Sequence, residues 1–121
     1  MGIRSSAGLL AIVGCAVGLA GARIAGAADT VTGEVVDLNC YMHDPATGHG
    51  TTHRQCATGC LKRGMPMGLL TGDKQVYLLL EDHNNPKPYG ALKDKAAETV
   101  TLEGEKVSQG GTQGFVVESL K

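Results

Sequence analysis

Four residues have the types and the spacing of a metal-binding site: Cys40, His53, Cys56 and Cys60. They follow the pattern C-x12-H-x2-C-x3-C. Residues three and four apart on a helix lie on one face, so the histidine and the last two cysteines would point the same way. Cys40, at the end of a preceding strand, would complete a Cys3His set, which is known from tetrahedral zinc sites. Because thiolates and imidazoles also bind copper, we expect one zinc or copper ion per chain.

Other donors surround these four positions. Thioethers suit Cu(I) better than zinc, and a histidine in a flexible loop can replace a thiolate. The auxiliary candidates are His43, His49, Met42, Met65 and Met67. Asp37, three residues before Cys40, is predicted to form a turn or to orient a ligand histidine from outside the metal shell.

Two other interpretations use the same cysteines. A disulfide from Cys40 to Cys56 or Cys60 would stabilise the domain by about 2–4 kcal/mol. The chain would then be an interaction module that binds a protein or a glycan without metal, and one thiol would stay unused. Alternatively, Cys56 near a helix N-terminus would be activated for thiol–disulfide exchange. No nucleophile elbow, phosphate loop or haem-attachment motif occurs in the sequence, so we predict a non-enzymatic protein without catalytic residues.

The N-terminal segment differs from the rest of the chain. Residues 1–27 have an early positive charge at Arg4, an apolar run and an A-x-A signal at Ala25–Ala27, which is the layout of a secretory signal peptide. We therefore expect a periplasmic or secreted protein, with another exported protein as a candidate partner. Cleavage would remove Cys15 and leave three cysteines, an odd number that disulfides within one chain cannot use up. In the alternative, Cys15 is lipidated, and only then is the membrane a partner.

Composition limits the function of the remaining chain, residues 28–121, which has the size of a single domain. Without the two arginines of the leader it has 9 basic and 12 acidic residues, a net charge of about −3. The whole chain has three tyrosines, one phenylalanine and no tryptophan. Binding of single-stranded nucleic acid usually combines a positive groove with stacking aromatic rings, so we expect no nucleic-acid partner.

The cysteines must be positioned by a small, mainly β domain. β-branched residues predict a first strand over 30–41, and Thr52 with Gln55 forms a capping box for a short helix that ends before Gly64. Further segments are a hairpin over 67–82 turning at Gly72-Asp73, a loop over 83–90, a short helix over 91–98, and strands over 99–107 and 114–121. This order predicts a five-stranded OB-like barrel. The cysteine-bearing helix is inserted after the first strand, and a second short helix precedes the last two strands. A small β-sandwich or an open roll is the alternative.

The segments "GEVVDLNC" and "HRQCATGC" resemble a group of small exported bacterial proteins, most of them without an assigned activity. Their pattern is close to G-x-[IV]-x-D-x-x-C followed by H-x-x-C-A-x-x-C and a glycine. The matching positions here are Gly33, Asp37, Cys40, His53, Cys56, Ala57, Cys60 and Gly64. The resemblance implies an exported OB-like module in which the cysteines and the histidine belong to one site.

Overall fold

The computed structural model describes residues 27–121. The predicted signal peptide, apart from Ala27, and the cysteine of the lipoprotein alternative, Cys15, lie outside this range. Within residues 27–121, no helix is long and apolar enough to span a membrane.

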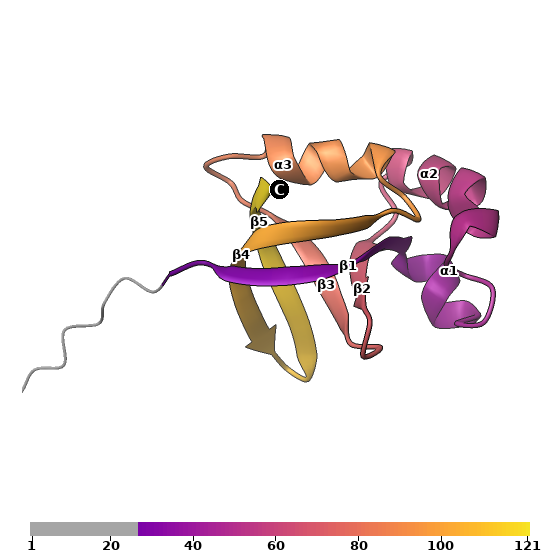
Figure 1. Ribbon diagram of the computed structural model, residues 1–121, viewed down its shortest axis with the longest axis horizontal. Coiled ribbons are helices and arrows are strands. Elements are labelled where there is room, and N and C mark those ends of the chain that lie inside the picture. Colours follow the sequence, from indigo (N-terminus) through magenta and orange to yellow (C-terminus); the bar gives the residue numbers. More distant parts are fainter. Residues whose placement is uncertain (1–26) are drawn as a thin grey trace, which may run out of the picture.

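Five strands form a closed barrel, which confirms the mainly β fold predicted from the sequence (Figure 1). The strands are β1 (Asp29–Asp37), β2 (Met67–Thr71), β3 (Val76–Glu81), β4 (Thr99–Gln109) and β5 (Thr112–Leu120). Around the barrel they follow the order β1-β2-β3-β5-β4. β3 and β5 run parallel, and all other neighbours are antiparallel. A closed barrel leaves no exposed sheet edge.

The core of the barrel is apolar. Successive residues of a strand point to opposite faces, and in β1 Val31 and Val35 are buried whereas Thr32 is exposed. The largest fully buried apolar side chains are Phe115, Leu61, Met67, Leu69, Leu79, Leu92 and Leu102. Two of them, Leu61 and Leu92, come from helical segments rather than from strands. The helices are therefore anchored in the same core as the strands.

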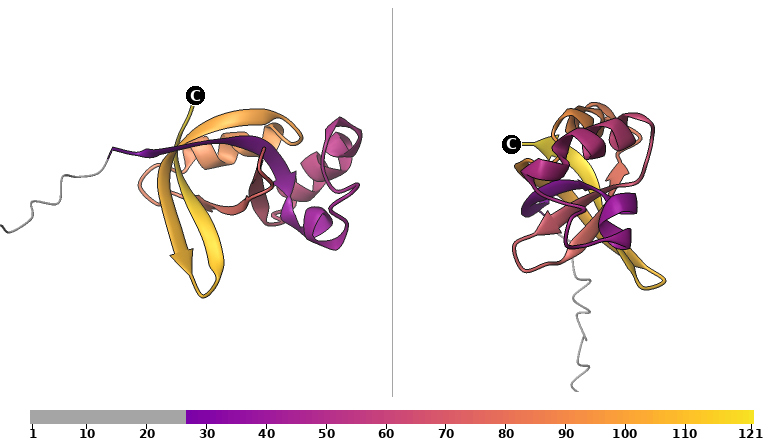
Figure 2. Two further views of the ribbon diagram at one scale, coloured as in Figure 1. Left: turned by 60° about the horizontal axis from the view of Figure 1, so that its bottom comes forward. Right: turned by 90° about the vertical axis from the view of Figure 1, so that its right-hand side faces the viewer.

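Residues 38–66, between β1 and β2, form an insertion that carries all three cysteines of the described chain. It contains α1 (Leu38–His43), the 3-10 turn η1 (Thr51–His53) and α2 (Arg54–Lys62). Figures 1 and 2 show α1 and α2 together at one end of the barrel. α2 ends at Lys62, and Gly64 follows with φ of +90°, so this helix ends where the sequence predicted.

Two predicted boundaries in the insertion are wrong. The strand expected to reach residue 41 ends at Asp37, because the Asp37 side chain accepts a hydrogen bond from the Asn39 N–H (3.0 Å) and caps α1. Cys40 therefore lies in a helix. The expected cap at Thr52 is also absent: residues 51–53 form η1, and α2 begins at Arg54 without a side-chain cap hydrogen bond.

The second predicted helix is present but begins earlier. α3 (Lys87–Ala91) and the 3-10 turn η2 (Leu92–Asp94) lie between β3 and β4, and part of α3 occupies the segment expected to be a loop. Pro88 is compatible with a helix there because it lies in the first turn, where its missing N–H has no partner to lose. Ala96, expected to be helical, instead forms a bridge with Val35 of β1.

Candidate metal centre

Three thiols converge in the insertion. Cys40 comes from α1, and Cys56 and Cys60 come from successive turns of α2. Their sulfur atoms all lie within 4.8 Å of one another. The three cysteines are free, and they differ in exposure: Cys60 is buried, Cys40 is intermediate and Cys56 is exposed. Together they form a group that can hold a metal ion with one side open to solvent.

α1 is held in place from both ends. At its start, the Leu38 N–H donates to the carbonyl of Pro66 (2.9 Å), which ties α1 to the chain entering β2. At its end, the Asp44 N–H donates to the carbonyl of Cys40 (2.9 Å). Gly48 lies directly against the Cys40 backbone, where an added Cβ would be only 2.6 Å from the Cys40 carbonyl oxygen. The position of the Cys40 side chain is therefore fixed by backbone contacts on two sides.

α2 presents its cysteines because its apolar residues fix its rotation. Ala57 and Leu61, four residues apart, are both buried and join the barrel core. Cys60, next to Leu61, is buried on the edge of the same face. Cys56 precedes Cys60 by four residues and therefore lies one turn away on the same side of the helix. The burial of Leu61 thus sets the direction in which both thiols point.

The structure groups His53 differently from the sequence prediction. The sequence placed His53 on one helix face with Cys56 and Cys60, whereas the structure places it in η1, just before α2. Its ring nitrogen lies within 4.8 Å of a carboxylate oxygen of Asp37 and of the sulfur of Cys40. Cys40 is thus common to two groups of donors, the three thiols and the set Asp37, Cys40 and His53.

Two buried polar atoms in this second group have no hydrogen-bond partner of ordinary geometry, namely Asp37 Oδ2 and His53 Nε2. Asp37 is completely buried and is the one charged residue in the buried class among residues 27–121. Buried polar atoms are nearly always satisfied in proteins, so each exception calls for an explanation. The sequence indicated Asp37 only as a turn residue or an outer partner and gave no sign of its burial.

The carboxylate of Asp37 also raises the pKa of two of the thiols. Hydrogen bonding of the protonated thiol to Asp37, followed by burial, raises the pKa of Cys40 to about 12. The same two causes raise the pKa of Cys60, although the positive charge of Arg63 opposes them. The Arg63 Nη2 group donates to the Cys60 sulfur at 3.2 Å. Activated thiols have a lowered pKa, so Cys40 and Cys60 have the opposite of the property required for thiol–disulfide exchange.

The auxiliary candidates lie around the site in different environments. Met67 is fully buried in the barrel core, whereas Met42 and Met65 have exposed side chains. His43 lies in the last turn of α1 and is exposed. Neither His43 nor His49 belongs to either group of donors.

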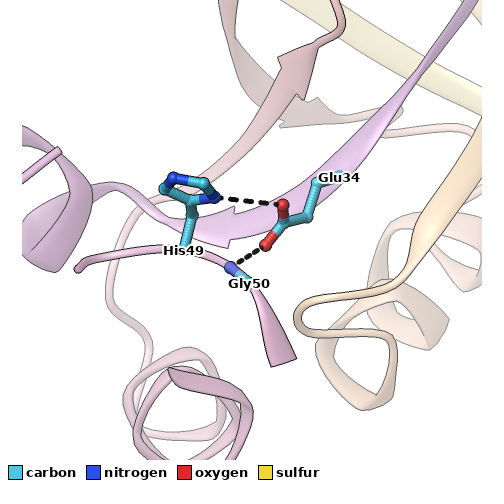
Figure 3. Close-up of polar contacts among 3 residues, drawn as sticks. All are labelled: Glu34, His49 and Gly50. Atoms are coloured by element: carbon cyan, nitrogen blue, oxygen red, sulfur yellow. Dashed lines mark hydrogen bonds and ion pairs between the residues drawn. The ribbon is translucent and has the colours of Figure 1, made fainter. Parts of the chain in front are cut away.

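His49 instead takes part in a contact that closes the loop before η1 (Figure 3). The Glu34 side chain of β1 bridges two neighbouring residues of this loop. Its Oε1 accepts a hydrogen bond from the Gly50 N–H (2.5 Å), and its Oε2 lies 3.5 Å from His49 Nδ1. The His49 ring also meets Tyr41 edge-on, with centroids 6.0 Å apart. Because η1 begins directly after Gly50, this contact fixes the start of the segment that carries His53.

Comparison with protein-family models, with curated proteins and with solved structures found no match for this chain. The resemblance to small exported bacterial proteins therefore stays a prediction from the sequence.

Proposed function

We propose that the chain binds one transition-metal ion, zinc or copper, through Cys40, Cys56 and Cys60, with His53 as a further ligand. The observation that carries the proposal is the convergence of three thiols from two helices within 4.8 Å. In a tetrahedral zinc–thiolate site the metal–sulfur distance is about 2.3 Å, which separates the sulfur atoms by roughly 3.8 Å. Small side-chain rotations are sufficient to bring the three thiols to this spacing.

The chemistry of the donors supports the same proposal. Thiolate and imidazole are ligands of zinc and copper, and the Nε2 atom of His53 is buried without another partner. Three thiolates around a divalent ion carry a net charge of −1. The guanidinium of Arg63, which already contacts the Cys60 sulfur, compensates part of this charge. Four protein ligands would leave no position for a catalytic water, in keeping with a non-enzymatic role.

We also propose, from the sequence alone, that the protein works outside the cytoplasm. The signal-peptide layout of residues 1–27 supports a periplasmic or secreted domain, and lipidation of Cys15 is the alternative. In that setting a small domain with three thiols would bind, buffer or carry a metal ion, with another exported protein as a possible partner. The composition gives no support for a nucleic-acid partner.

The deciding experiment measures bound metal and free thiols on the same sample of exported protein, purified without reductant. We expect about one equivalent of zinc or copper, and removal of the metal by a chelator should expose three thiols. His53→Ala should weaken binding, whereas His83→Ala, at an exposed loop histidine, serves as the matched control. A protein without metal that has one free thiol and one disulfide would contradict the proposal and favour the disulfide-stabilised interaction module.

A further inference from the structure

The buried carboxylate of Asp37 has no cationic partner, although the protonated thiols of Cys40 and Cys60 lie beside it. Its side chain has no exposed surface, and one oxygen accepts the Asn39 N–H while Oδ2 has no partner. No lysine, arginine or histidine of residues 27–121 forms an ion pair with Asp37. The nearby cation Arg63 instead donates to the sulfur of Cys60. Buried carboxylates are normally paired or coordinate a metal, and this one lacks a paired cation.

The donor atoms around Asp37 are close enough to share one metal ion. A carboxylate oxygen, the Cys40 sulfur and a ring nitrogen of His53 all lie within 4.8 Å of one another. Yet neither Asp37 Oδ2 nor His53 Nε2 makes a hydrogen bond, so the two groups are neighbours without being direct partners. Metal–ligand bonds of about 2.0–2.3 Å place the donors of one ion roughly 3–4 Å apart. A cation between these donors would satisfy both unpartnered atoms at once.

From this geometry we infer that Asp37 is itself a metal ligand, and that the site selects a borderline divalent ion of the zinc type over Cu(I). The inference rests on the proposed metal-binding function and adds an oxygen donor to its sulfur and nitrogen donors. Carboxylate oxygen is a good ligand for Zn²⁺, whereas Cu(I) prefers thiolates and thioethers. In a four-coordinate site the oxygen of Asp37 would replace one thiolate, and Cys56, the most exposed of the three thiols, is the ligand that is most easily given up.

The substitution Asp37→Asn tests the inference with little change of shape. The asparagine oxygen can still accept the Asn39 N–H, so the cap of α1 is retained, but the negative charge is lost. We expect Zn²⁺ affinity, measured by competition with a chromophoric chelator, to fall at least tenfold, and Cu(I) affinity to stay within about threefold. The matched control is Asp44→Asn, which changes an exposed acid that makes the same kind of turn contact, with the N–H of Ala46.

The outcomes separate this inference from the proposed function. If the wild-type protein binds neither ion, the proposed function fails. If it binds Zn²⁺ and Asp37→Asn binds Zn²⁺ equally well, or loses Zn²⁺ and Cu(I) to the same extent, only the role of Asp37 is refuted.

X-ray absorption at the zinc edge of the wild-type protein provides a second test that does not depend on how the variant folds. We expect at least two nitrogen or oxygen donors beside the sulfur atoms. A shell of three sulfurs and a single nitrogen would overturn the assignment of Asp37.

Discussion

Replacing Glu34 by alanine tests whether the loop before η1 positions the proposed metal site. The Glu34 carboxylate fixes this loop through Gly50 and His49. A hydrogen bond to a charged group contributes about 1.5–3 kcal/mol. The contact with His49 adds at most about 1 kcal/mol, because the two side chains are 40% and 19% exposed. Most of the stabilisation of the loop that Glu34→Ala removes therefore comes from the hydrogen bond to the Gly50 N–H.

We expect the lost stabilisation of the loop to lower the metal affinity of Glu34→Ala. Without the contact, the segment that carries His53 must be ordered by the metal, at a cost of about 2 kcal/mol. Since 1.4 kcal/mol corresponds to a factor of ten, the affinity should fall about 30-fold. Glu34→Gln keeps an acceptor for the Gly50 N–H and loses only the charge, so its affinity should fall by about threefold.

The assay is a zinc or cobalt titration against a competing chelator, with folding of each variant checked by circular dichroism. The control is Glu103→Ala, which removes another ion pair, to Lys121 at 2.7 Å, but one that belongs to β4 and the C-terminus. It should bind metal like the wild type. If folded Glu34→Ala retains wild-type affinity, the loop does not depend on this contact, and the reasoning is refuted.

The remaining predictions concern protonation and the barrel. Because the pKa of Cys40 is raised to about 12 and that of Cys60 is also raised, both thiols are protonated at pH 7 without metal. Binding must release at least these two protons, so the logarithm of the apparent affinity should rise by at least about 2 per pH unit between pH 6 and 8, measured by the same competition assay. A flat profile would show that these thiols are not ligands. Phe115→Ala, in the centre of the core, should lower the free energy of unfolding by about 3–5 kcal/mol in urea denaturation. Gly104→Ala would place a Cβ 1.8 Å from the carbonyl oxygen of Val116, so the strands must shift, and it should cost about 1–3 kcal/mol in the same measurement.

The barrel was predictable because its signals are local. Two apolar runs separated by the turn at Gly72-Asp73 indicate β2 and β3 directly, and the structure confirms this hairpin. The end of α2 was equally predictable from the sequence, since Lys62 and Gly64 are typical of a helix C-terminus. The grouping of Cys40 with Cys56 and Cys60 was predicted from the types and spacing of these residues, although the first cysteine was expected in a strand.

The details of the site depend on contacts that a sequence does not display. Asp37 follows a run of β-branched residues, and only the packing of the insertion over the end of β1 makes it a buried helix cap. An aspartate is usually exposed, so its complete burial contradicts the expectation from residue type alone. The contact of Glu34 with Gly50 joins residues 16 positions apart through an irregular loop, for which no periodic pattern exists.

The distribution of buried residues explains why a metal ion bound at this position would stabilise the insertion. α1 has no buried residue, and of the insertion only α2 contributes large apolar contacts, through Leu61, to the core. Residues 38–53 are therefore held mainly by hydrogen bonds, by Glu34 and by the contact of Leu38 with Gly68, and they add no buried apolar side chain to the core. A metal bound to Cys40 and to the cysteines of α2 would link this weakly packed segment to a helix that is anchored in the barrel. Removal of the metal should then accelerate hydrogen exchange in residues 38–53 and leave the five strands unchanged, because local opening follows local packing. Equal acceleration in the strands would show that the metal stabilises the whole domain instead.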